Sequence, residues 1–179
     1  MTVPEPNATP DLEHLYQAHF NHVWRTLRRL GVTERYLEDA AHDVFIVVHR
    51  RLPDFEVGRP ARPWLTGIAY RVAADHRKRA HIKRERYGQS PSLRPSGQPS
   101  VPQLLEAKER RDLVHRALEE LDLPHRVVFV MYELDDIPCT VIAESLDIPV
   151  NTVYSRLRNA RMRFTDAVHQ HTQASEGAK

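Results

Sequence analysis

The stretch from Ile137 to Phe164 restricts the fold of this chain more than any other part, because its pattern predicts two helices joined by a tight turn. Its first half has apolar residues at helical spacing, and Ala143 is small where a second helix would cross closely. Asp147 to Pro149 predict the turn, since aspartate tolerates a left-handed backbone better than most residues. This is the pattern of a helix-turn-helix.

The second helix of this pair has a narrow apolar stripe, formed by Val153, Leu157 and Ala160. Its other faces are polar or basic and carry Asn151, Thr152, Tyr154, Ser155, Arg156, Arg158, Asn159 and Arg161. A helix anchored along one thin stripe leaves polar side chains free to hydrogen-bond base edges and phosphates in the major groove. The alternative is an ordinary helical hairpin with a solvated basic face.

Charge is distributed unevenly along the chain, although the net charge is only +2. Arg71 to Arg86 contains seven basic residues against two acidic ones, and Val150 to Arg163 contains four arginines and no acid. Exposed surfaces usually mix both signs, so these two zones indicate a polyanionic partner that is contacted at two places. Charge by itself also allows two solvated helix faces.

The chain divides into two blocks. Residues 87–103 are rich in proline, serine and glycine and predict a flexible linker. We therefore expect one domain at residues 11–86 and another at residues 104–170, with weakly structured tails at residues 2–10 and 172–179.

Apolar residues at three- and four-residue spacing predict helices throughout the first block. The first helix spans Leu12 to Leu30 and ends at Gly31, the second spans Thr33 to Leu52, and the third begins at Pro63 and continues into the basic stretch.

The second block predicts a helix from Leu104 to about Asp122 and another from Pro124 to Leu134, ahead of the helix-turn-helix. The runs VFIVV and VVFVMY have strand propensity, but no regular two-residue alternation with hairpin turns supports a sheet. The expected fold class is therefore all-α, with two small helical domains.

The sequence indicates a cytoplasmic protein without membrane insertion. Its apolar runs are far shorter than the roughly 20 residues that span a bilayer, and no secretory signal is visible. The single cysteine, Cys139, fits a reducing compartment and a small buried structural role.

An enzyme is not expected. His14, His19 and His22 are near one another in sequence, but their spacing does not place all three on one helix face. The chain has no HExxH, no CxxC and no glycine-rich phosphate loop, so we predict no metal site, no cofactor and no small-molecule substrate.

Four segments resemble one protein family. IAESLDIPVNTVYSRLRNAR is similar to region 4 of the extracytoplasmic-function sigma factors, and LEELDLPHRVVFVMYELDDIP to the helices that lead into it. YLEDAAHDVF resembles region 2.2 of the same family, and RPWLTGIAYRVAADHRKR resembles region 2.3 running into 2.4. The resemblance spans about Leu12 to Phe164, in the family's order and with a linker where the family has one.

The resemblance implies a bacterial transcription initiation factor that binds core RNA polymerase and promoter DNA. In this family the region 2.2 helix docks on the clamp helices of polymerase, which here implies roles for Asp39, His42, Asp43 and Phe45. The alternative for this segment is a solvated helix face with Phe45 in the core.

The resemblance also implies that the loop before Trp64 captures a flipped base of the −10 element. Extruding a base costs a few kcal/mol, so a pocket that stacks and hydrogen-bonds it supplies melting and specificity together. The implied −10 residues are Phe55, Gly58, Arg62, Trp64, Arg71, Asp75, Arg77, Lys78, Arg79, Lys83 and Arg84. Phe55 is equally consistent with a loop anchor packed on the domain.

The polar residues of the helix-turn-helix would address the −35 element. Three positions depart from the family pattern: Arg71 stands where asparagine is common, Asp147 where glycine is, and Asn159 where a basic residue often is. We expect Arg71 to alter how the −10 base is read, and because of the departure at Asn159 no consensus promoter is transferred.

The sequence therefore predicts a sigma factor that directs promoter recognition, DNA melting and transcription initiation. Family members are usually held inactive by an anti-sigma factor, so such a partner is expected, and it can hold the protein at the inner membrane. The alternative is a transcriptional regulator that binds DNA through its C-terminal helix-turn-helix alone. A simple regulator has no need of the second basic zone.

Overall fold

The computed structural model describes residues 11–56, 58–87 and 102–176. Every regular element in these ranges is helical, as the hydrophobic spacing predicts. None of the helices in this described part has the length and apolarity needed to cross a membrane. The predicted all-α fold class is confirmed.

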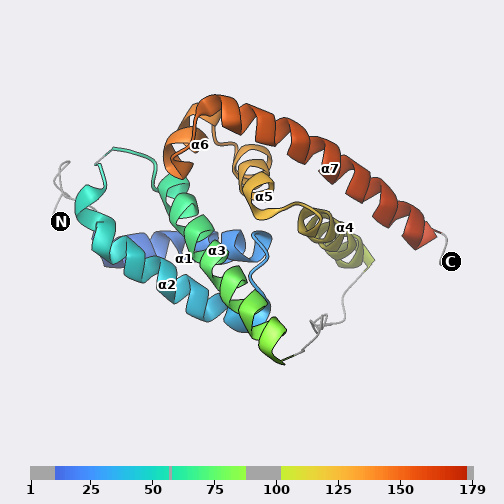
Figure 1. Ribbon diagram of the computed structural model, residues 1–179, viewed down its shortest axis with the longest axis horizontal. Coiled ribbons are helices and arrows are strands. Elements are labelled where there is room, and N and C mark those ends of the chain that lie inside the picture. Colours follow the sequence, from blue (N-terminus) through green and yellow to red (C-terminus); the bar gives the residue numbers. More distant parts are fainter. Residues whose placement is uncertain (1–10, 57, 88–101, 177–179) are drawn as a thin grey trace.

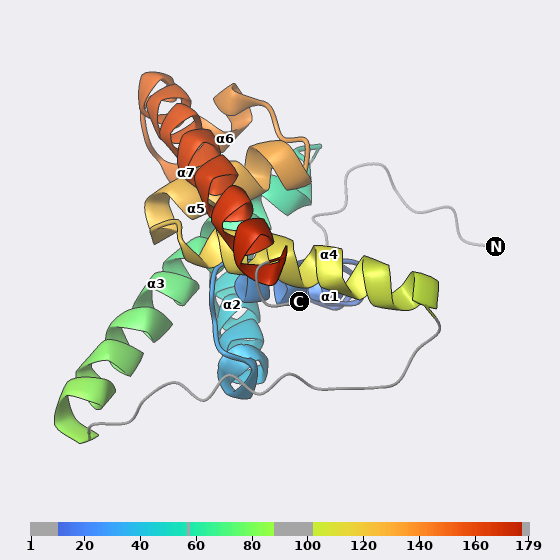
Figure 2. The same cartoon turned by 90° about the vertical axis from the view of Figure 1, so that its right-hand side faces the viewer.

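Three helices form the N-terminal unit (Figure 1): α1 (Leu12–Arg29), α2 (Leu37–Arg51) and α3 (Ala61–Tyr87). They pack against one another in all three pairings. Gly31 follows α1 with a φ of 85°, which is the left-handed backbone that glycine adopts at a helix end. In a second view, the C-terminal half of α3 extends away from the other helices (Figure 2).

Four helices form the C-terminal unit: α4 (Pro102–Glu119), α5 (Leu123–Phe129), α6 (Cys139–Leu146) and α7 (Val150–Glu176). A π-helical turn, η3 (Val130–Leu134), continues α5. The β-branched runs in both units are helical, because their side chains at helical spacing enter the core. Tertiary packing therefore overrides local strand propensity.

Several predicted boundaries are wrong by a few residues. The segment after Thr33 is a 3₁₀ turn, η1 (Glu34–Tyr36), and α2 begins only at Leu37. The Thr33 side chain makes no capping hydrogen bond. A second 3₁₀ turn, η2 (Leu52–Asp54), follows α2, and α3 starts two residues before Pro63.

The predicted C-terminal tail and linker are also too long. α7 continues to Glu176, and Ala167 is still buried in its second half, where α7 packs on α4. Helix α3 includes Tyr87, and α4 begins at Pro102. The remaining linker positions, 88–101, and the predicted N-terminal tail lie outside the described residues.

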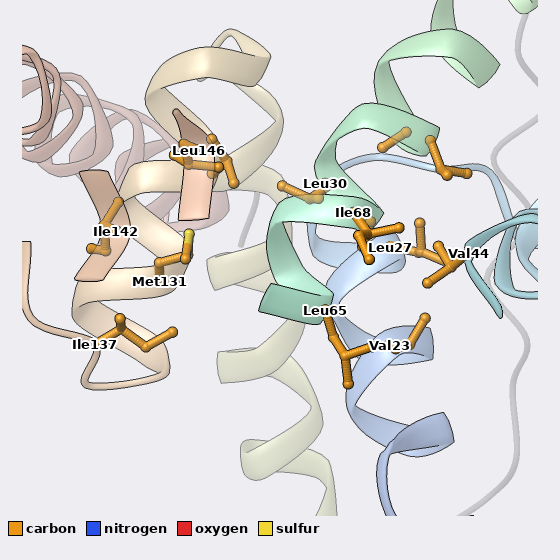
Figure 3. Packing of buried hydrophobic residues seen from close by; sticks show 14 of the residues in the cluster. Val23, Leu27, Leu30, Val44, Leu65, Ile68, Met131, Ile137, Ile142 and Leu146 are labelled. Carbon is orange, nitrogen blue, oxygen red and sulfur yellow. The ribbon is translucent and has the colours of Figure 1, made fainter. Parts of the chain in front are cut away.

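One hydrophobic core joins the two units. Figure 3 shows Leu30, Leu65 and Ile68 of the N-terminal unit together with Met131, Ile142 and Leu146 of the C-terminal unit. These six side chains belong to a single cluster of buried residues. A smaller cluster lies under α7, where the rings of Phe129 and Phe164 stack with centroids 4.5 Å apart.

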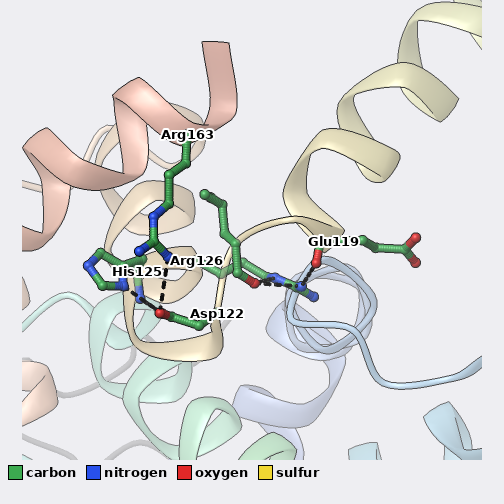
Figure 4. A network of polar contacts seen from close by, with 6 residues as sticks. Glu119, Asp122, His125, Arg126 and Arg163 are labelled. Atoms are coloured by element: carbon green, nitrogen blue, oxygen red, sulfur yellow. Dashed lines mark hydrogen bonds and ion pairs between the residues drawn. The ribbon is translucent and has the colours of Figure 1, made fainter. Parts of the chain in front are cut away.

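Asp122 and Arg126 hold the corner between α4 and α5 (Figure 4). The Asp122 carboxylate caps α5 by accepting the His125 backbone N–H at 3.0 Å. Arg126 is buried and donates to the backbone carbonyls of Glu119 at 2.9 Å and Leu121 at 2.8 Å. Burial lowers the pKa of the Arg126 guanidinium to about 10, so it stays protonated at neutral pH.

Substituting Asp122 tests the cap of α5. Asp122→Ala should lower the free energy of unfolding by about 1 kcal/mol, whereas Asp122→Asn should retain most of it, because asparagine also caps helices well. The measurement is urea denaturation at pH 7. Equal stability of the two variants would contradict the capping role.

The difference in stability between the wild type and Asp122→Asn should depend on pH. Burial opposes ionisation of Asp122, but hydrogen bonds from His125 outweigh it and lower the pKa of the carboxyl. A lowered pKa in the folded state means that the ionised carboxylate stabilises the fold above its unfolded-state pKa. The stability difference between wild type and Asp122→Asn should therefore disappear as the pH falls through the lowered pKa.

Candidate nucleic-acid interface

The helix-turn-helix predicted from the sequence is present as α6, a tight turn and α7. Asp147 lies in the left-handed region with φ 56° and ψ 53°, and the Ile148 N–H donates to the Ala143 carbonyl at 3.0 Å. These features confirm the turn, and they show that aspartate holds a backbone conformation that glycine more often adopts.

Helix α7 is anchored along the predicted narrow stripe. Val153, Leu157 and Ala160 are all buried, while Tyr154 is 56% exposed. Of the other predicted contact residues, the exposed ones are Asn151, Ser155, Arg158 and Arg161, and the half-buried ones are Thr152, Arg156 and Asn159. The first turns of α7 thus present polar side chains on an open surface.

The arginines of α7 differ in whether they form ion pairs within the structure. The Arg161 guanidinium donates to a Glu133 carboxylate oxygen at 2.6 Å and lies over the ring of Tyr132, and the hydrogen bond to Glu133 raises the pKa of Arg161. Arg163 lies 3.4 Å from Asp122. Within the described residues, Arg156 has no ion-pair partner.

Arg158 is likewise without an ion pair to any described residue, and its side chain is exposed. Arg156 and Arg158 are therefore the arginines of α7 that can meet a phosphate or a base edge without first breaking an internal contact. Arg161 is held by Glu133 in the turn after α5, a contact that sequence spacing does not reveal because the two residues are far apart along the chain.

The predicted −10 residues lie in the loop before α3 and along α3 itself. Phe55 is 8% exposed and packs on Trp64 with ring centroids 4.8 Å apart, so it anchors the loop to the domain. Trp64 is half-buried, and Arg62 and Gly58 are exposed. Gly58 has a φ of 94°, a backbone conformation that other residues rarely adopt.

The basic stretch follows α3 away from the core. The exposed side chains there are Arg71, Asp75, Arg77, Lys78 and Arg79. The backbone of Lys83 and Arg84 is helical, but their side chains lie outside the described part of the chain. The outward direction of α3 in Figure 2 keeps this surface open to a large partner.

The predicted polymerase-binding residues divide between surface and core. Asp39 and His42 are exposed on α2, and an Asp43 carboxylate oxygen lies 2.9 Å from His76 Nε2. Phe45 is 6% exposed and packs against Tyr16 with ring centroids 4.7 Å apart. Phe45 is therefore a core residue, which is the alternative that the sequence left open for it.

Of the histidines considered for a metal site, His22 Nε2 lies 3.1 Å from the Thr66 hydroxyl oxygen. Burial lowers the pKa of both His19 and His22. No group of three or more metal-ligating side chains occurs among the described residues.

A pocket lies between the loop before α3 and helix α6. It has a volume of about 490 Å³. We call it the loop pocket, and its lining includes Phe55, Arg59, Trp64, Arg71, Glu144 and Ser145. It combines predicted −10 residues with residues of the helix-turn-helix, which only the tertiary fold brings together.

Two family models match this chain. Sigma-70 region 2 matches residues 15–82, and Sigma-70 region 4 matches residues 111–164. Together they cover more than half of the chain, and each contains one of the two basic surfaces described above.

Curated relatives of the chain are named as sigma factors. The ECF RNA polymerase sigma factor SigE of Mycolicibacterium smegmatis is 24% identical over 166 residues, which are 92% of this chain and 64% of the relative, so the chain spans just under two thirds of that protein. The ECF RNA polymerase sigma-E factor of Escherichia coli is 28% identical over 165 residues, with 87% of this chain and 85% of the relative covered.

Solved structures share the fold. The sigma factor RpoE from Bartonella quintana, crystallised with the anti-sigma factor NepR, superposes with a TM-score of 0.68 at 18% identity, covering 89% of this chain and 97% of that one. CnrH in complex with the cytosolic domain of CnrY gives 0.60 at 21% identity, covering 89% and 88%. With both regions in order, the chain belongs to the sigma-70 family, and within it to the extracytoplasmic-function RNA polymerase sigma factors.

Proposed function

We propose that this protein binds core RNA polymerase and directs it to promoters that have both a −35 and a −10 element, where it supports melting and initiation. The observation that carries the proposal is the presence of two open basic surfaces on two different units, one on α3 and one on α7. A protein that reads one duplex site needs a single surface, whereas a bipartite promoter requires two.

The two surfaces have different chemistry. Arg156 and Arg158 on α7 suit contacts to base edges and phosphates of the −35 duplex. The row of bases on α3 suits salt-dependent phosphate contacts, and the nearby aromatic pair Phe55 and Trp64 suits contact with an unpaired base. Of this pair, Trp64 is the more accessible member, and Phe55 positions it.

The exposed face of α2 suits polymerase binding, because Asp39 and His42 lie free of the core and Asp39 is acidic. The protein acts in the cytoplasm in this role and performs no catalysis of its own, since polymerase supplies the chemistry. Because the Bartonella neighbour was crystallised with an anti-sigma factor, we include a protein partner of that kind in the proposal.

Transcription with purified core polymerase over a promoter library tests the proposal directly. We expect run-off transcripts with defined start points that appear only when the protein is added. DNA binding by the isolated protein without any specific transcript would refute the proposal and favour the alternative, a regulator that uses the helix-turn-helix alone.

Substitutions in α7 test the −35 assignment. Arg156→Ala and Arg158→Ala should each remove about 1–3 kcal/mol of discrimination between intact and scrambled −35 elements, while leaving core binding intact. Arg110→Ala, which removes an exposed arginine of α4, is the matched control. Loss of core binding in the α7 variants would show that this helix has another role.

Releasing Arg161 tests whether its ion pair limits DNA contact. Glu133→Gln weakens the partner of Arg161, so we expect the salt dependence of binding to random duplex DNA to steepen by up to about one unit of slope, as for one added phosphate contact. Glu109→Gln on α4 makes the same change of charge elsewhere. An identical slope in both variants would argue that Arg161 already contacts DNA in the wild type.

A further inference from the structure

His76 on α3 is turned toward the inside of the N-terminal unit, although both of its neighbours in sequence lie on the surface. Asp75 and Arg77 are exposed, whereas the His76 side chain is only 14% exposed. His76 follows the buried Val72 and Ala73 by four and three residues, so it continues the apolar stripe of α3 at helical spacing. A polar ring in this position needs a hydrogen-bond partner.

Asp43 on α2 is that partner. Helices α2 and α3 pack against one another (Figure 1), and the carboxylate oxygen Oδ2 of Asp43 lies 2.9 Å from His76 Nε2. A carboxylate accepts hydrogen bonds, so Nε2 carries a proton and is the donor. Hydrogen bonds to a charged group are stronger than those between neutral groups. The bond therefore restricts the orientation of the Asp43 side chain.

Asp43 stays accessible while it is held in this way. Its side chain is 43% exposed, and its second carboxylate oxygen, Oδ1, forms no hydrogen bond or ion pair with the described residues. Asp39 lies one helical turn earlier on the same face of α2 and is exposed. The face that the proposed function assigns to polymerase thus includes an exposed carboxylate and a second one that α3 holds.

A side chain that is already ordered loses less conformational entropy when a partner binds it. Ordering one flexible side chain at an interface lowers the affinity by a factor of about two to ten. In this chain the hydrogen bond from His76 orders Asp43 before any partner is present. Binding through Asp43 therefore avoids that loss of affinity.

We propose that His76 is a positioning residue for the binding of core polymerase: it holds the Asp43 carboxylate in the orientation that a basic group of polymerase meets. His76 acts through Asp43 and not by its own contact with polymerase, because its ring lies between α2 and α3. This inference rests on the proposed function, which assigns the exposed face of α2 to polymerase. It gives the helix of the predicted −10 surface a part in the docking of the enzyme.

Removal of the imidazole tests this role. His76→Ala should weaken binding of the full chain to purified core polymerase by about two- to tenfold, measured by the anisotropy of the fluorescently labelled protein. His76→Gln should restore most of the affinity, because the glutamine amide nitrogen can donate from a position close to that of Nε2. His169→Ala removes an exposed histidine of α7, and this matched control should bind as the wild type does.

A double-mutant cycle separates positioning from an independent effect of His76. In the Asp43→Ala background, His76→Ala should cause no further loss of core affinity, because no carboxylate is left to position. Equal losses in both backgrounds, or no loss in the single variant, would overturn the proposal. The same holds if His76→Gln binds polymerase no more tightly than His76→Ala.

Binding of random duplex DNA provides a readout that the positioning role should not change. The basic side chains of α3, such as Arg77 and Lys78, are exposed and do not depend on the bond between His76 and Asp43. His76→Ala should therefore bind this DNA as the wild type does at the same salt concentration. A parallel loss of DNA and polymerase binding would show that α3 is loosened as a whole, and it would overturn the proposal.

The proposed function can fail separately from this inference. If the wild type does not bind core polymerase, the proposed function and the role of His76 are both rejected. If the wild type binds and His76→Ala binds equally well, the role of His76 alone is rejected.

Discussion

The packing of α3 against α6 is the contact that joins the two units of the structure. Gly67 allows the two helices to approach until its α-carbon faces the Ser145 carbonyl, and a continuous buried core forms around that contact. The same contact therefore joins the two units, forms the loop pocket and places Glu144 beside Arg59.

The two basic surfaces have different relations to this packing. Helix α7 is attached by a thin stripe that includes Val153 and Leu157, so the polar faces of its first turns are open. The loop before α3 lies beside α6, and residues of both line the loop pocket.

Much of the fold and part of the candidate site could be predicted from the sequence. The helices, the left-handed turn at Asp147 and the buried stripe of α7 follow from hydrophobic spacing within short segments. The start of α2 at Leu37 and the continuation of α7 to Glu176 do not follow from the spacing, because the ends of these helices depend on packing partners elsewhere in the chain. The burial of Phe45 was left open for the same reason, since helical spacing does not reveal which neighbour covers a side chain.

The sequence by itself determined the class of the fold, the family and the identity of the two basic zones, because helix periodicity, turn chemistry and charge are properties of neighbouring residues. Only the tertiary structure decided that Arg161 is engaged by Glu133, that Arg156 and Arg158 are free of ion pairs to described residues, and that α6 borders the loop pocket. These contacts join residues from distant parts of the chain. They depend on how closely helices can approach one another, which is set by side-chain volumes on both sides of an interface and not by any local pattern.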